Sequence, residues 1–304
     1  MKKISRRKFL QQSVAGSAVI AANTNNLFAL DDGLRTEKKI DRVVLGKSGV
    51  KISRIAFGTG TNGWKFKSSQ TRLGEKEFID LAYHAYNSGI TFFDAADIYG
   101  SHQYVRRLLG HISRENMVIM SKIWTEPNDW LTPQNVPDSL DRFRRELGTD
   151  YIDIVLLHCQ TAADWPEIHK KMRDDLAAAK EKGIIRAHGV SCHSPEALQT
   201  AADYDWVDVL LARINPLGIR MDDKPAKVMP VLRQARKNGK GVLGMKIFGC
   251  GQLTAEPERE KSLRYVLGSG NVDAMTIGFE NKHQIDDTIS RVNRIMHQLS
   301  GNKS

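Results

Sequence analysis

The sequence is poor in cysteine and lacks long hydrophobic runs and low-complexity segments. It has 3 cysteines and 9 prolines in 304 residues, and no run of about 18 apolar residues occurs. Three cysteines, Cys159, Cys192 and Cys250, cannot form a closed disulfide framework. We therefore expect no stable membrane span and a fold held by its core. A hydrophobic share of 41% and a charged share of 26% exclude a disordered or collagen-like chain.

The net charge of +10 is unevenly spread along the chain. Residues 1–30 contain five basic residues and no acidic one, which leaves 40 basic and 35 acidic residues in the rest. The remainder has no basic run interleaved with aromatics, as a groove that follows a phosphate backbone would need. We expect no nucleic-acid partner.

The amino terminus has the pattern of a targeting segment. Ser5–Leu10 reads Ser-Arg-Arg-Lys-Phe-Leu, and a weakly apolar stretch with small residues at Ala21, Ala22 and Ala29 follows. This resembles a twin-arginine export signal. The resemblance implies a signal peptide over 1–30, a linker over 31–41, the twin-arginine machinery as a partner, and a periplasmic or otherwise exported protein. A basic tail followed by a short helix is the alternative.

Beyond residue 40, short apolar runs alternate with amphipathic stretches of 3.6-residue period. This alternation predicts βα units, and eight of them predict a closed (β/α)8 TIM barrel over 42–300. A doubly wound open sheet is the alternative, but no Gly-x-Gly-x-x-Gly follows the first strand. Val43–Ile52, with a central Gly-Lys-Ser-Gly, predicts an amino-terminal β-hairpin. The runs begin near Ile55, Ile90, Met117, Ile152, Ile184, Val207, Val242 and Val272.

Proline and glycine mark the ends of the predicted helices. Pro133 and Pro195 stand where helices can begin, because proline fits the first helical turn. Gly148 follows a helical pattern and predicts a stop, as do Gly89, Gly183 and Gly239.

Four ionisable side chains follow three consecutive predicted strands. Asp94 and Tyr99 follow the second run, Lys122 ends the third, and His158 ends the fourth. In a parallel barrel the carboxyl ends of the strands converge on one face, where active sites lie. Singly, each residue has a structural interpretation: a helix cap, a loop anchor, a solvated lysine, a core histidine. Their joint placement favours a catalytic group.

The chemistry of this group suits reduction of a carbonyl. An ammonium beside a phenol favours the phenolate, so Lys122, held by Asp94, is expected to lower the pKa of Tyr99. Tyr99 would then donate a proton to a carbonyl oxygen that His158 orients. None of these groups supplies a hydride, so a cofactor must.

The same residues resemble the aldo-keto reductases over Arg42–Leu299. Phe93–Gly100 is similar to the family motif Phe-Asp-Thr-Ala-x-x-Tyr-Gly, and Ser121-Lys122 and Leu156-Leu157-His158 follow in the expected order. The resemblance implies a (β/α)8 barrel, a nicotinamide cofactor and a small-molecule carbonyl substrate. It implies Tyr99 as the proton donor, Lys122 and Asp94 as its tuning pair, and His158 as the orienting group.

The resemblance also implies a set of cofactor contacts, in which this sequence departs from the family. Cys192 stands where an asparagine is common, Met245 replaces the aromatic that stacks on nicotinamide, and Gln284 replaces an arginine that grips the 2′-phosphate. NADP(H) is favoured because the family favours it, with NAD(H) as the alternative. The implied contacts are Thr59, Ser191, Cys192, Met245, Gly278, Asn281, Gln284 and Asp287.

Three other interpretations remain open. Thiolates with neighbouring imidazoles suit zinc, but no Cys-x-x-Cys or His-x-x-x-His spacing occurs, so we predict no metal site. Lys122 as a Schiff-base nucleophile would make the protein an aldolase or lyase. A barrel that keeps its pocket only for sensing or binding is the third.

Overall fold

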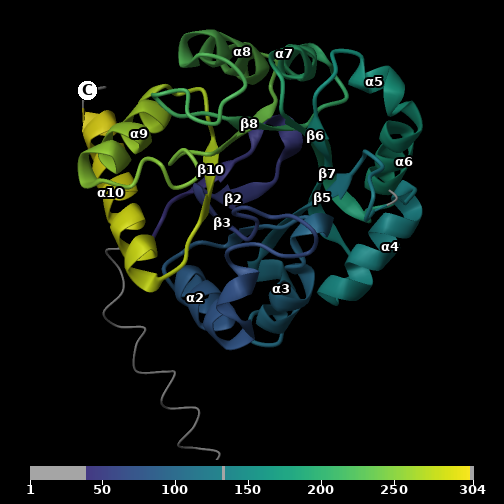
Figure 1. Ribbon diagram of the computed structural model, residues 1–304, viewed down its shortest axis with the longest axis horizontal. Helices are drawn as coiled ribbons and strands as arrows, with labels where there is room; N and C mark the ends of the chain where they lie inside the picture. Colours follow the sequence, from purple (N-terminus) through teal and green to yellow (C-terminus); the bar gives the residue numbers. More distant parts are fainter. Residues whose placement is uncertain (1–38, 132–133, 302–304) are drawn as a thin grey trace, which may run out of the picture. The chain divides into compact units, whose positions relative to one another are not determined.

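The computed structural model describes residues 39–131 and 134–301 (Figure 1). The predicted signal peptide and most of the predicted linker lie outside the described residues, as does Pro133.

Eight parallel strands close into a barrel, each paired with its neighbour in chain order and the last with the first. This confirms the predicted (β/α)8 barrel and excludes the open sheet. Every strand begins within two residues of its predicted start. The strands are β3 (Ile55–Gly58), β4 (Phe92–Asp94), β5 (Val118–Trp124), β6 (Ile152–Gln160), β7 (Ile185–Cys192), β8 (Val209–Arg213), β9 (Gly241–Met245) and β10 (Ala274–Gly278).

The helices surround the strands, as Figure 1 shows looking into the barrel. They are α2 (Glu75–Asn87), α3 (His102–Leu109), α4 (Val136–Leu147), α5 (Trp165–Ile168), α6 (Lys170–Glu181), α7 (Pro195–Asp203), α8 (Pro225–Lys237), α9 (Glu256–Gly268) and α10 (Lys282–Gly301). Short 3-10 turns are η1 (Gly46–Ser48), η2 (Thr71–Leu73), η3 (Asp97–Tyr99) and η4 (Arg114–Asn116).

Local chemistry sets the helix ends. Ser194 caps α7 by accepting from Ala197 N at 3.0 Å, and Pro195 opens its first turn as predicted. Gly148 ends α4 at φ 69°, a conformation that glycine adopts without steric cost. Asn135 caps the start of α4 by accepting from Asp138 N at 2.9 Å. The start of this helix thus depends on an asparagine.

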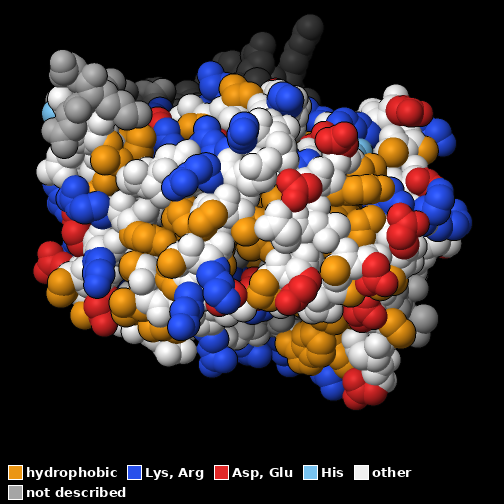
Figure 2. All heavy atoms as spheres, turned by 90° about the horizontal axis from the view of Figure 1, so that it is seen from above, with side chains coloured by type: hydrophobic (Ala, Val, Ile, Leu, Met, Phe, Trp, Pro, Cys, Tyr) orange, Lys and Arg blue, Asp and Glu red, His pale blue; other side chains and the backbone are white. Residues whose placement is uncertain are grey.

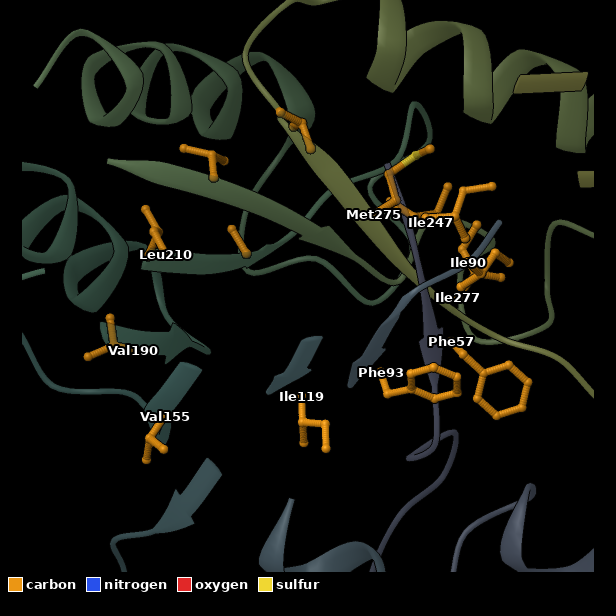
Figure 3. Close-up of a cluster of buried hydrophobic side chains, with 14 of the residues drawn as sticks. Phe57, Ile90, Phe93, Ile119, Val155, Val190, Leu210, Ile247, Met275 and Ile277 are labelled. Carbon is orange, nitrogen blue, oxygen red and sulfur yellow. The ribbon is translucent and has the colours of Figure 1, made fainter. Parts of the chain in front are cut away.

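Successive side chains along each strand point to opposite faces of the sheet, which divides the hydrophobic core into two clusters. Side chains on one side of the sheet, among them Phe57, Phe93, Ile119 and Val155, face the helices (Figure 3). The rings of Phe57 and Phe93 lie 5.8 Å apart and come from neighbouring strands. Alternate side chains form a second cluster inside the barrel: Phe92, Val118, Met120, Ile154, Leu156, Val209, Leu211 and Leu243, with smaller neighbours. The period of two therefore decides which polar strand-end residues face the interior.

The predicted amino-terminal hairpin is present and fills one end of the barrel. β1 (Arg42–Val44) pairs with β2 (Lys51–Ser53) in antiparallel register. Leu45 and Ile52 are buried in the inner cluster. The turn presses against the start of β9, because a Cβ on Gly46 would lie 2.3 Å from Gly241 N. The amino ends of the strands are thus covered by apolar side chains.

The described surface mixes side chains of both charges. On the face drawn in Figure 2, basic, acidic and hydrophobic side chains are interspersed. Within residues 39–131 and 134–301, no helix has the length and apolar character needed to cross a bilayer.

The hairpin packing predicts a large stability difference between two neighbouring positions. Leu45→Ala should lower the free energy of unfolding by about 2–5 kcal/mol, because it leaves a cavity in the inner cluster. Val44→Ala, at a side chain 54% exposed, should change it by less than about 0.5 kcal/mol. Urea unfolding measures both. Equal losses for the two variants would contradict the buried position of Leu45.

Candidate active site

The four predicted catalytic residues meet at the carboxyl ends of three adjacent strands. Asp94 is the last residue of β4, Lys122 lies near the end of β5, and His158 lies near the end of β6. Tyr99 ends η3, which follows β4 directly. These strands pair in the order β4, β5, β6, so the polar side chains share one rim of the barrel.

Lys122 and Asp94 form a buried ion pair. The Lys122 ammonium is only 1% exposed, and it donates to Asp94 Oδ1 and to the carbonyl oxygen of Ala95 at 3.0 Å. The other carboxylate oxygen of Asp94 accepts from Thr276 Oγ1 at 2.7 Å. A buried charge is tolerated when it is paired and hydrogen-bonded in this way. The lysine is therefore fixed in place.

Tyr99 lies beside both the ion pair and His158. Its hydroxyl oxygen is 3.4 Å from His158 Nε2, and Lys122 Nζ lies 4.9 Å from the centre of its ring. The loop after β3 covers the phenol closely, since a Cβ on Gly60 would lie 2.1 Å from Tyr99 Cε2. Only glycine permits this approach, which holds the ring against the rim.

The expected lowering of the Tyr99 pKa is wrong. Burial raises the pKa of the phenol well above its ordinary value, and the carboxylates of Asp94 and Asp97 and, once ionised, the thiol of Cys159 act in the same direction. The shift is upward although Lys122 Nζ lies beside the ring. Tyr99 thus keeps its proton throughout the neutral range, as a donor must.

His158 is a neutral imidazole at neutral pH. Burial lowers its pKa well below the ordinary value, and the ammonium groups of Lys122 and Lys246 and, once protonated, the imidazole of His193 act in the same direction. Its Nδ1 is buried and has no hydrogen-bond partner among residues 39–131 and 134–301, so the proton belongs on Nε2, facing Tyr99. The edge of the Trp124 ring, 5.5 Å away, packs against the imidazole. His158 can therefore donate one hydrogen bond at the site.

A groove leads away from Tyr99 across the ends of β3, β9 and β10. Its inner part has a cavity volume of about 130 Å³ and its outer part about 450 Å³, and six residues line both parts. The volume of the outer part lies in the range of small-molecule and cofactor sites. The shared residues are Thr61, Phe248, Cys250, Gly251, Ile277 and Gly278. The two parts thus form one continuous groove from the catalytic residues to α10.

Five of the eight predicted cofactor residues line this groove. Met245 and Gly278 lie in its inner part, and Gly278 also borders the outer part. Asn281, Gln284 and Asp287 lie in the outer part, at the start of α10. The predicted nicotinamide and adenosine ends therefore map to opposite ends of one groove.

The other three lie elsewhere. Thr59 is buried and hydrogen-bonds to the carbonyl oxygen of Asp94 at 2.8 Å. Ser191 Oγ accepts from Cys159 N at 2.8 Å. Cys192 belongs to the core between sheet and helices, because it alternates with the inward Ser191. None of the three lines the groove, so the structure gives no support to their assignment as cofactor contacts.

Other residues line the groove that sequence reasoning did not assign. Lys246, Phe248 and Cys250 come from the segment after β9, and Arg259 comes from α9. Lys246 could have been predicted from the sequence, because it directly follows the end of a strand. Arg259 could not, because a charged residue within a helix ordinarily faces solvent.

A second set of hydrogen-bonded polar side chains lies beside the four catalytic residues. Cys159 Sγ is 2.7 Å from His193 Nδ1, which also contacts Arg213 Nη2 at 2.5 Å, and Arg213 pairs with Asp222 at 3.0 Å. Burial raises the pKa of Cys159 to about 11. Burial, with Arg213, Lys246 and Lys122, lowers the pKa of His193 to about 3. Both groups are therefore neutral at neutral pH.

The low pKa of His193 predicts a pH-dependent stability. The unfolded chain binds this proton near pH 6.5 and the folded one only near pH 3, so acidification favours unfolding. His193→Gln should remove up to about 1.4 kcal/mol per pH unit of this dependence below pH 6.5. Urea unfolding between pH 7.5 and 5 measures it. The exposed His297→Gln is the control, and parallel curves for His193→Gln and wild type would contradict the assignment.

Comparison with known proteins gives one consistent family. Residues 54–298 match the model of the aldo/keto reductase family. An NADPH-dependent D-xylose reductase from Meyerozyma guilliermondii is 29% identical over 66% of this chain and 66% of its own length. An NADH-specific methylglyoxal reductase from Escherichia coli is 23% identical over 82% of this chain and 79% of its own.

A solved structure shares the fold. The holo form of an aldo-keto reductase from Bacillus halodurans superposes with a TM-score of 0.68 at 19% identity, over 86% of this chain and 96% of that one. The chain spans about two thirds of the xylose reductase and about half of a related soybean (Glycine max) protein, where the match covers 49%. With the family model matched over most of its length, the chain belongs to the aldo/keto reductase family.

Proposed function

We propose that the protein is an NAD(P)H-dependent oxidoreductase that reduces aldehyde or ketone carbonyls to alcohols. The observation that carries this proposal is a protonated, partly buried Tyr99 hydroxyl, 3.4 Å from a neutral His158, at the inner end of a long groove. Family membership supports it. A small-molecule carbonyl compound is the proposed substrate.

The chain's own residues account for the proton side of the reaction. His158 Nε2–H donates a hydrogen bond to the carbonyl oxygen and orients it beside Tyr99. As negative charge develops on that oxygen, Tyr99 transfers its proton to it. The Lys122 ammonium, held by Asp94 below the ring, stabilises the phenolate that remains. A nicotinamide cofactor, when bound, supplies the hydride.

The groove residues fit such a cofactor. Met245 can pack on a flat ring at the inner end, near Tyr99. At Gly278 a Cβ would lie 1.9 Å from Thr61 Oγ1, so the backbone itself forms the wall that both parts share. We favour NADP(H) because the family does, with NAD(H) as the alternative. The relatives named above include an NADPH-dependent and an NADH-specific enzyme. Arg259, at the outer end, offers the cation that Gln284 does not.

The two competing functions lack a supporting observation. A Schiff-base lysine needs a free amine, whereas Lys122 is buried and paired with Asp94. A barrel used only for sensing would have no need of the Tyr99, His158 and Lys122 arrangement. Reduction of a carbonyl gives each of these three residues a role.

The proposal predicts a strong effect of one hydroxyl. Tyr99→Phe should reduce kcat by a factor of about 10²–10⁴, because it removes the hydroxyl that donates the proton. NADPH oxidation with an aromatic aldehyde measures turnover, and fluorescence titration should show nearly unchanged cofactor affinity. Tyr83→Phe, on the helix α2, is the control and should keep wild-type activity. Full turnover by Tyr99→Phe would exclude Tyr99 as the donor.

We also propose that residues 1–30 direct export of the protein by the twin-arginine machinery to the periplasm or beyond. The support is the Arg6-Arg7 pair followed by Phe9-Leu10 and a weakly apolar stretch. This route carries folded proteins, so the barrel would be exported after assembly.

The export proposal predicts that Arg6→Lys with Arg7→Lys retains the protein in the cytoplasm. The charge is kept, so only recognition of the arginine pair is lost. Cell fractionation with immunoblotting measures the distribution, and Lys2→Arg with Lys3→Arg is the matched control. Unchanged export of the double arginine variant would overturn the proposal.

A further inference from the structure

Strand β5 runs on past its neighbour β4 at the catalytic rim. β4 ends at Asp94, which is paired in register with Met120 of β5. β5 continues to Trp124, and beyond Met120 its pairs among the described strands are with β6 alone. A backbone N–H on the β4 side of this extension therefore needs an acceptor from outside the sheet.

The side chain of Asp97 supplies that acceptor. Its Oδ2 accepts from Trp124 N at 2.9 Å, and the residue is only 6% exposed. Arg142 Nη2 lies 4.0 Å from the same oxygen. The other oxygen, Oδ1, is buried and has no hydrogen-bond partner among residues 39–131 and 134–301. Burial raises the pKa of this carboxyl group above its ordinary value, although the bond from Trp124 N acts to lower it.

A carboxyl group with so few partners is a poor choice for stability alone. A buried polar atom without a hydrogen bond costs free energy of folding, and an apolar side chain of similar size would avoid that cost. The bond to Trp124 N joins Asp97 to another segment of the chain. The place of Trp124 is therefore what this group controls.

Trp124 carries the effect of Asp97 to His158. The two residues are paired in register between β5 and β6, and their ring centres lie 5.5 Å apart at an interplanar angle of 85°. Within the part of the chain that the structure describes, His158 Nδ1 has no hydrogen-bond partner. Packing against Trp124 therefore helps to fix the direction of the imidazole.

Asp97 also belongs to the segment that carries Tyr99. It is the first residue of η3, and Tyr99 is the last. Tyr99 N donates to the carbonyl oxygen of Ala96 at 3.2 Å, so the turn is one short unit. One carboxyl group thus joins the turn that holds the proton donor to the strand end that packs on His158.

Another aspartate makes the same kind of bond at the opposite end of the barrel. Asp273, directly before β10, accepts from Val242 N at 2.8 Å and is 7% exposed. Val242 lies at the amino end of β9, where the hairpin turn packs. Apart from an ion pair with Arg236 at 3.0 Å, Asp273 matches Asp97 in burial and in its bond to a strand. It lies away from the catalytic rim and so provides a matched comparison.

We propose that Asp97 is a positioning residue, which clamps the end of β5 to the η3 turn and so holds Trp124 and His158 in place beside Tyr99. Asp97 lines neither part of the groove, so it acts through Trp124 rather than on a ligand. The inference rests on the proposed function for its kinetic arm only, because the bond and the place of the Trp124 ring can be measured without turnover.

The test compares wild type with Asp97→Ala, Asp97→Asn and Asp273→Ala. Asp97→Ala removes the acceptor, and Asp97→Asn keeps an acceptor oxygen in a side chain of the same size. Asp273→Ala removes the matching bond at the other end of the barrel.

Two kinds of measurement separate the bond from its effect on the reaction. The chain has 5 tryptophans, so isotope labelling of tryptophan gives few NMR signals, and Trp124→Phe assigns those of Trp124. Hydrogen exchange of the Trp124 amide reports the bond, and the Trp124 indole signal reports whether the ring keeps its place. The kinetic arm measures kcat and KM for benzaldehyde, with NADPH affinity by fluorescence and stability by urea unfolding.

In Asp97→Ala, we expect exchange of the Trp124 amide to be at least about tenfold faster, because the bond that protects it is gone. The indole signal should shift, and kcat should fall at least about tenfold, since a small displacement of reacting groups is costly. NADPH affinity should stay near the wild-type value, because the groove runs across β3, β9 and β10. Asp97→Asn should recover both the slow exchange and kcat. Asp273→Ala should lower stability and leave kcat unchanged.

Wild-type exchange or wild-type kcat in Asp97→Ala would overturn the inference. An equal loss of kcat in Asp97→Ala and Asp273→Ala would do the same, since it would point to stability alone. If Asp97→Ala does not fold, Asp97→Ser, whose side chain is one bond shorter, replaces it with the same expectations. A wild type that reduces no aldehyde would refute the proposed function. Faster exchange and a shifted indole signal in Asp97→Ala would then still support the clamp, and their absence would refute it.

Discussion

A lysine ammonium buried in the mouth of a barrel constrains everything around it. Lys122 has almost no exposed surface, so its charge is stable only because Asp94 and the Ala95 carbonyl oxygen accept from it. Asp94 must in turn be held, which Thr276 achieves from β10, two strands away around the barrel. Removing one partner of such a pair typically costs about 3–5 kcal/mol. The pair thus joins β4, β5 and β10 and defines where the phenol of Tyr99 can lie.

Most of the architecture followed from periodicity and from the places where strands end. Eight apolar runs at regular spacing sufficed for the barrel, and the turn residues after Val43 sufficed for the hairpin. The meeting of Asp94, Tyr99, Lys122 and His158 followed from a rule of parallel barrels: strand carboxyl ends share one face. These features depend on local sequence and on topology alone.

What could not be predicted depends on burial and on side-chain direction. The rise in the Tyr99 pKa needs the degree of desolvation, which a sequence does not contain. Cys192 and Ser191 are adjacent in sequence and point to opposite faces of the sheet. The position of each in the pleated strand determines that Cys192 faces the helices. Arg259 reaches the groove from α9, and its charge gave no reason to expect it there. The outer end of the groove was therefore less predictable than the catalytic rim.

The hairpin under the barrel has a consequence for access to the site. Leu45, Val50 and Ile52 are buried in the inner cluster and close the end opposite the rim. Molecules therefore reach Tyr99 from the side where the strands end at their carboxyl termini.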